Sequence, residues 1–171
     1  MTFRGRVFYC GPSINIEGLN SHSQLMPNRE SEEELKIQED LDSTLKSVDS
    51  AEAIVMKAAQ ELGFDDDDQH QIGMAVRECV VNAVVHGNRY SAHKKVHLKV
   101  LSGSDHMAIT ISDEGSGFDL SSLPDPLAPE NLLRQSGRGI LLIRAFMDEF
   151  ELHPGAGGGT EVRLVKRLNK R

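Results

Sequence analysis

Hydrophobic and polar positions become regular after an N-terminal stretch without clear periodicity. Residues Leu35–Ile37 alternate with charged neighbours, which predicts a short strand. Apolar residues then recur at helical spacing from Val48 to Gly63, which predicts a helix. A second helix is expected from about residue 68 to residue 86, with Gly87 as its stop. The acidic run at residues 65–68 should cap that helix, because carboxylates stabilise the positive end of its dipole.

The second half of the chain predicts four strands and one more helix. Alternating residues favour strands around Val96–Val100 and Met107–Ile111, and a helix is expected to start near Gly137. Two closing strands, around residues 150–152 and 160–165, flank a glycine-rich hairpin loop. This order predicts an α+β fold, a two-layer sandwich with helices over one face of a mixed or antiparallel sheet.

Three segments define the expected domain organisation. Residues 1–31 are an N-terminal extension, in which only Phe3–Tyr9 give weak support to an edge strand. Residues 32–171 form one domain, a reasonable size for a single core. Residues 114–136, rich in Gly, Ser, Pro and Asp, are too long for a simple connection, and loops of this length are usually functional or disordered.

Charge and composition narrow the function classes. The net charge of −7 argues against direct binding of nucleic acid as the default. The basic stretch 163–171 is either a solvated chain end or a contact for an acidic partner. No apolar run is long enough for a signal peptide or a membrane span, so we expect a cytoplasmic protein. A disulfide between Cys10 and Cys79 lacks support, because Cys79 lies in an apolar helical stripe.

Asp113 is the first candidate for chemistry. It follows Ile109 and Ile111 in alternation, so its carboxylate should lie on the helix-covered face, where it needs hydrogen-bond donors. The amino group of a purine is one such donor, and Gly115 and Gly117 would let a flat ligand approach the backbone. The alternative is that the strand ends before Asp113, which then begins an ordinary turn.

Glu78 and Asn82 form a second candidate pair. They lie four residues apart on one flank of the predicted second helix, away from its apolar stripe. An Asn carbonyl can take one place in the oxygen shell of Mg²⁺, and a Glu one turn earlier can deprotonate a nucleophile beside a phosphate. The alternative is a polar flank on an amphipathic helix. His86 is better explained as a structural or capping residue than as a catalytic one.

The predicted start of the third helix is a candidate anion site. Gly137 and Gly139 would expose free N–H groups there, and Arg134 and Arg138 could add positive charge near a phosphate or be solvated. Thr160 is in register with Val162 and Leu164, so its hydroxyl should face the same interior as Asp113. It could equally be an ordinary threonine at a strand start.

These residues fall in four segments that follow one another along the chain. The segments are Glu78–Gly87, Asp113–Asp119, Gly137–Ile140 and Gly159–Val162. Together they resemble the four sequence boxes of the GHKL ATPase/kinase superfamily, which includes gyrase, heat-shock chaperone, histidine kinase and mismatch-repair ATPases. The resemblance covers about residues 33–168. It implies a sandwich of the Bergerat type and an ATP lid at about residues 114–136.

Within this superfamily the chain looks most similar to bacterial anti-sigma-factor serine/threonine kinases. The likeness lies in the Glu-x-x-x-Asn-Ala-x-x-His-Gly helix and in the run 136–149. It implies that Asn82 holds Mg²⁺, that Glu78 is the catalytic base and that Asp113 recognises adenine. The other ATP-binding residues that it implies are Gly115, Gly117, Arg134, Gly137, Arg138, Gly139, Ile140 and Thr160.

The resemblance implies an anti-sigma factor that binds a sigma factor and phosphorylates a serine on an anti-anti-sigma protein of the STAS type. A homodimer would also fit it. The alternative is a non-catalytic ATP-responsive module that only regulates a partner. A sensor histidine kinase fits less well, because little chain precedes the Glu78 helix for a dimerisation hairpin. A gyrase-type function fits poorly, because no transducer domain follows residue 171.

Overall fold

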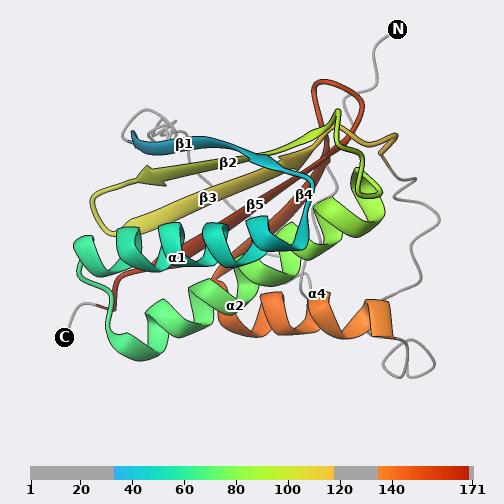
Figure 1. Cartoon of the computed structure of the whole chain (residues 1–171). Coiled ribbons are helices and arrows are strands. Elements are labelled where there is room, and N and C mark those ends of the chain that lie inside the picture. The colour runs from blue at the N-terminus through green and yellow to red at the C-terminus, as the bar shows by residue number, and fades with distance from the viewer. Residues whose placement is uncertain (1–32, 118–134, 170–171) are drawn as a thin grey trace, which may run out of the picture.

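In the part of the chain that the structure describes, three α-helices cover one face of a five-stranded sheet (Figure 1). The computed structural model describes residues 33–117 and 135–169. Its helices are α1 (Leu45–Glu61), α2 (Asp66–Asn82), the π-helix η2 (Ala83–Gly87) and α4 (Gln135–Phe146). Its strands are β1 (Glu34–Asp42), β2 (Lys95–Ser102), β3 (His106–Asp113), β4 (Glu149–Pro154) and β5 (Thr160–Arg167). The predicted α+β two-layer sandwich is confirmed.

The sheet has the order β1-β2-β3-β5-β4, and each neighbouring pair is antiparallel. No parallel pair occurs among these five strands. The sequence allowed a mixed or an antiparallel sheet, and the described sheet is antiparallel. The hairpin between β4 and β5 lies where the glycine-rich loop was predicted.

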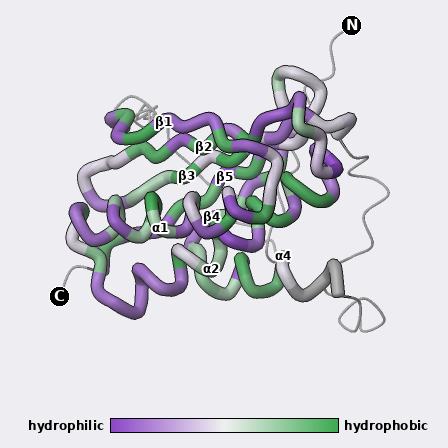
Figure 2. The backbone as a smooth tube through the Cα atoms, in the orientation of Figure 1, coloured by the Kyte–Doolittle hydropathy of each residue, from purple (hydrophilic) through white to green (hydrophobic). Residues whose placement is uncertain are grey.

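The core lies between the sheet and the helices. Residues at alternate positions of β2 and β3 point towards the helices, and their side chains are 0–1% exposed: Val96, Leu98, Val100, Met107, Ile109 and Ile111. The helices contribute mostly small and branched residues to the same cluster, among them Val55, Ala59, Val76 and Val80. Figure 2 shows hydrophilic and hydrophobic positions interchanging along the strands and helices. The alternation of apolar and polar residues predicted from the sequence of β2 and β3 therefore places the apolar residues on the inner face of the sheet.

The predicted helix ends hold to within a few residues. Helix α1 begins three residues before Val48, and α4 begins two residues before Gly137. The acidic cap is confirmed, because the Asp65 side chain accepts a hydrogen bond from the Asp68 N–H at 2.9 Å. The second helix differs from the expectation at its end, because α2 stops at Asn82 and a π-helix completes the last turn.

Strand β1 is longer than predicted and contains an irregularity. Leu35 lies opposite Leu101 and Ile37 lies opposite Val100, so a bulge separates the two residues and puts them on opposite faces. As a result Leu35 is 51% exposed, while Ile37 packs against the core.

Two further predictions concern Cys79 and membrane spans. Cys79 is free and buried, and burial raises the pKa of its thiol to about 12, as expected for an inert core residue. In the described ranges, no helix is long and apolar enough to cross a membrane. The suggested strand at Phe3–Tyr9, Cys10 and Arg134 lie outside the described residues.

Candidate functional site

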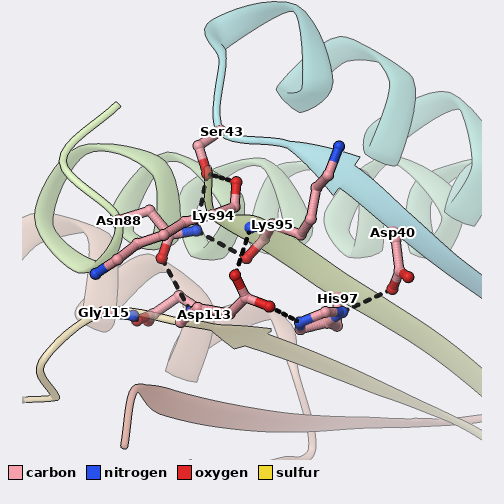
Figure 3. A network of polar contacts seen from close by, with 9 residues as sticks. Asp40, Ser43, Asn88, Lys94, Lys95, His97, Asp113 and Gly115 are labelled. Atoms are coloured by element: carbon pink, nitrogen blue, oxygen red, sulfur yellow. Dashed lines mark hydrogen bonds and ion pairs between the residues drawn. The ribbon is translucent and has the colours of Figure 1, made fainter. Parts of the chain in front are cut away.

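Asp113 is the last residue of β3. Its side chain lies on the inner face of the sheet, and Asp113 is 8% exposed. Val96 lies opposite it on β2, so pairing does not stop before Asp113, and the turn alternative is wrong. The N–H of Gly115 donates a hydrogen bond to Asp113 Oδ1 at 2.8 Å (Figure 3). One carboxylate oxygen is thereby held by the backbone that follows it.

Three glycines pack closely against Asp113. A Cβ at Gly87 would lie 2.5 Å from Asp113 Oδ2, and one at Gly115 would lie 2.6 Å from Oδ1. A Cβ at Gly159 would first meet the backbone carbonyl oxygen of Asp113 and would lie 2.8 Å from Oδ1. Such distances are too short for real Cβ atoms, so each position tolerates only glycine without a rearrangement. Because these glycines come from η2, the segment after β3 and the segment before β5, three parts of the chain converge on one carboxylate. We call Gly87, Gly115 and Gly159 the glycine cradle.

Gly117 and Thr160 extend this region. Gly117 has φ +70°, and a Cβ there would lie 2.8 Å from the carbonyl oxygen of Gly158, so the segment after β3 passes close to the β4–β5 hairpin loop. Thr160 is half-buried at the start of β5. Two residues later Val162 lies opposite Ile111, so strand alternation places Thr160 on the face of Asp113, as predicted.

Glu78 and Asn82 lie one turn apart at the C-terminal end of α2. Glu78 is half-buried, whereas Asn82 is exposed and is the last residue of the α-helix. The π-helix begins at the next residue, and π-turns within helices occur frequently at functional sites. Its wide last turn brings Gly87 against Asp113. His86 lies in this turn with an exposed side chain.

The N-terminal part of α4 lies against Glu78. A Cβ at Gly139 would lie 2.8 Å from Glu78 Oε2, so the carboxylate approaches the helix backbone where glycine leaves room. Ile140 is half-buried beside it. Gly137 and Arg138 lie in the first turn of α4, where the structure describes the backbone alone. The predicted phosphate segment and the predicted base are thus brought together.

The described residues contain no group of three His, Cys, Asp or Glu side chains that could hold a metal ion by themselves. Asn82 offers a single neutral oxygen at an exposed position. A hard cation such as Mg²⁺ accepts one such oxygen when phosphates and water supply the other ligands. The donor set therefore fits a cation that arrives with a nucleotide.

Sequence reasoning missed two residues beside the site, Asn88 and Glu114. Asn88 is 2% exposed, and its side chain bonds to three separate segments of the chain. Its sequence context, just after Gly87, is typical of a turn and gives no signal of burial. Glu114 follows Asp113 directly, and only the fold reveals its partners, the N–H of Lys95 and the ring of His97.

Comparison with known proteins shows similarity in sequence and in fold. Residues 41–166 match the model of the histidine kinase-like ATPase domain. The anti-sigma F factor of Oceanobacillus iheyensis is 36% identical over 108 residues, which cover 61% of this chain and 73% of that protein. The anti-sigma F factor of Bacillus subtilis is 35% identical over 108 residues, with the same coverage.

A solved structure agrees on the fold. It contains the RsbU and RsbW domains of Rv1364c from Mycobacterium tuberculosis, with a TM-score of 0.57 and 21% identity. The match covers 79% of this chain but only 33% of that longer chain. The match to the domain model covers well over half of the chain, and the family that the four segments indicated is confirmed. The chain belongs to the histidine kinase-like ATPase domain family, and anti-sigma F factors are among its relatives.

Proposed function

We propose that this protein is an anti-sigma factor that binds Mg-ATP, transfers its γ-phosphate to a serine of an anti-anti-sigma protein of the STAS type, and binds a sigma factor. The proposal that the protein binds ATP rests on one observation, the position of the Asp113 carboxylate inside the glycine cradle. The partners are proposed from the relatives, which are named anti-sigma F factors.

Adenine would be read by Asp113. The Gly115 N–H occupies Oδ1, so Oδ2 is the oxygen that would accept a hydrogen bond from the exocyclic amino group of the base. The glycine cradle keeps bulk away from that oxygen, and Thr160 and Gly117 would line the same pocket. A flat base can approach the backbone closely where the neighbouring residues are glycines.

The triphosphate would extend from Asp113 along the end of α2 towards α4. Free N–H groups in the first turn of α4, at Gly137–Gly139, would bind phosphate oxygens, and Arg134 and Arg138 would add positive charge. Asn82 would hold the Mg²⁺, which neutralises phosphate charge when bound. We propose that residues 114–136 act as the lid over this nucleotide.

Glu78 would act as the general base. Its carboxylate would accept the proton of the serine hydroxyl as the serine oxygen bonds to the γ-phosphorus. The bond from that phosphorus to the bridging oxygen breaks, and ADP leaves. A half-buried carboxylate next to the α4 backbone suits this role, because it lies beside the proposed phosphate segment.

A second candidate function is a module that binds ATP without transferring phosphate. The close approach of Glu78 to Gly139 favours it, since in such a module the carboxylate would serve only to seat α4 on α2. The two functions differ in one measurable property, the appearance of phosphoserine on a partner.

The test incubates the chain with Mg-ATP and purified STAS-type proteins from the same cell, then searches for phosphoserine by mass spectrometry. Transfer by the wild type that falls at least 100-fold in Glu78→Gln, with ADP affinity unchanged, supports the kinase. No transfer to any of these proteins by a chain that binds ATP would favour the module. Undiminished transfer by Glu78→Gln would show that Glu78 is not the base.

A further inference from the structure

The backbone directly after Asp113 is held by a buried amide. Asn88 Oδ1 accepts a hydrogen bond from the Glu114 N–H at 2.9 Å. Asn88 Nδ2 donates to Ser43 Oγ and to the Lys95 carbonyl oxygen, both at 2.8 Å. Figure 3 shows these contacts converging from the loop before α1, the start of β2 and the end of β3. One side chain therefore fixes residue 114 relative to three other parts of the fold.

The side chain of Glu114 holds the same residue from the other face of the sheet. Its Oε2 accepts a hydrogen bond from the Lys95 N–H at 2.9 Å, and its Oε1 lies 3.1 Å from His97 Nε2. His97 Nδ1 in turn lies 2.6 Å from Asp40 Oδ1 on β1. His97 alternates with the buried Val96 and Leu98, so its ring lies on the outer face of the sheet, and Glu114 is anchored outward while Asp113 lies inward.

The anchored residue is the direct neighbour of Asp113 in the chain. Residue 114 is the link between Asp113 and the Gly115 N–H that holds Asp113 Oδ1. A rotation of the backbone at residue 114 would move both the carboxylate and its donor within the glycine cradle, where the three glycine positions lack room even for a Cβ. Catalytic and binding groups need neighbours that lock them in this way.

We propose that Asn88 and Glu114 are positioning residues of the adenine site, acting through Asp113 without touching the nucleotide. The proposal rests on the proposed function, because it assumes that Asp113 reads adenine. It predicts that loss of either anchor lowers the selectivity for adenine, whereas a purely structural role would lower stability or weaken all nucleotides alike.

The test compares ADP with inosine diphosphate, which carries an oxygen where adenine has its amino group. The wild type should bind ADP at least tenfold more tightly than inosine diphosphate in the presence of Mg²⁺. Glu114→Ala and Asn88→Ala should each lower this ratio at least threefold. Glu114→Gln should keep most of it, because its amide oxygen can still accept from the Lys95 N–H. Lys99→Ala, at an exposed position on the outer face of β2, is the matched control and should leave the ratio unchanged.

The possible outcomes distinguish a failure of the positioning role from a failure of the proposed function. If the wild type binds ADP selectively and the folded Glu114→Ala variant keeps the wild-type ratio, the positioning role is wrong. Equal weakening of both diphosphates in that variant would also overturn it, as a purely structural effect. If the wild type does not bind ADP, the proposed function fails first. Glu114 is exposed, so the test stands on this residue even if Asn88→Ala does not fold.

Discussion

Gly87 and Asp113 lie so close that no side chain fits between them. A Cβ at residue 87 would lie 2.5 Å from Asp113 Oδ2 and 2.6 Å from Oδ1. The contact joins the π-turn after Asn82 to the end of β3, so it couples the proposed metal ligand to the proposed adenine ligand. Residues 82 and 113 are far apart in the sequence, and this contact is one of those that bring them together, with the hydrogen bond from the Glu114 N–H to Asn88 as another.

Substitution of Gly87 by Ala should therefore displace the Asp113 carboxylate. We expect Gly87→Ala to weaken ADP binding at least tenfold, because the carboxylate must leave its position next to the Gly115 N–H. Isothermal titration calorimetry measures this directly. Gly157→Ala is the control, since a Cβ at Gly157 meets nothing within 4 Å. An unchanged ADP affinity in Gly87→Ala would contradict the geometry of the glycine cradle.

Gly139→Ala should separate stability from chemistry. Alanine is favoured over glycine within a helix by up to about 1 kcal/mol, so α4 should not be weakened. The new Cβ would lie 2.8 Å from Glu78 Oε2 and push this carboxylate aside. We expect a melting temperature equal to or above that of the wild type and phosphate transfer reduced at least tenfold. A variant with wild-type transfer would show that the Glu78 position is not critical.

A buried ion pair far from the nucleotide site supports the fold. Lys166 Nζ lies 3.0 Å from Asp68 Oδ1, and the two side chains are only 11% and 10% exposed. The same ammonium donates to Gln71 Oε1 at 2.9 Å and to the Phe146 carbonyl oxygen at 2.8 Å. It thereby joins β5 to the start of α2 and the end of α4.

Lys166→Met should lower the free energy of unfolding by about 3 kcal/mol, because it leaves Asp68 buried without its counter-charge. Urea denaturation at neutral pH measures this loss. The double variant Lys166→Met/Asp68→Leu should regain much of it, because no unpaired charge is then left. If the double variant is as unstable as the sum of its single variants, the two residues do not act as a pair.

Two histidines on the outer face of the sheet should make stability depend on pH. The hydrogen bond to Asp40 raises the pKa of His97, and the contact with Glu114 raises it further against the effect of burial. Burial lowers the pKa of His106, but its hydrogen bonds to Glu33 and Asp105 outweigh this, so its pKa is also raised. Both rings therefore bind a proton more tightly in the folded chain than in the unfolded one.

A histidine whose pKa is raised in the folded state stabilises that state. The stabilisation is fully present at a pH below the pKa of the unfolded chain, which is about 6.5 for histidine. The stabilisation is lost as the pH rises through the folded pKa values. The free energy of unfolding should consequently decrease from about pH 6 to about pH 8. His97→Gln and His106→Gln should each flatten this decrease, while His93→Gln, at an exposed loop position, should not. A wild-type stability that rises over this range would contradict the assignment.

The sequence predicted on which face of its strand or helix each site residue lies better than it predicted the contacts between these residues. Alternation along β3 was enough to place Asp113 inward, and helical spacing was enough to place Glu78 and Asn82 one above the other. Both are local, periodic properties of a single element. The π-turn at residues 83–87 was not predictable in this way, because it spans a single turn and is too short to show a period of its own.

The contacts around the glycine cradle depend on segments that are distant in sequence. Asn88 bonds to residues 43, 95 and 114, and no pattern near Asn88 encodes those partners. The bulge at Leu35 likewise arises from pairing with β2, not from local alternation. Gly87 was predicted as a helix stop, but the structure shows that its lack of a side chain also admits Asp113.

The most direct test of the central claim is the affinity of Asp113→Asn for ADP in the presence of Mg²⁺. Asparagine has nearly the same shape, and its amide oxygen can still accept from the Gly115 N–H, so the fold should be kept. Its amide nitrogen cannot accept from the amino group of adenine, and loss of a hydrogen bond to a charged group costs about 1.5–3 kcal/mol. We therefore expect binding weakened by about 10- to 100-fold relative to the wild type. Equal affinity in the two proteins would contradict the assignment of Asp113 as the adenine ligand.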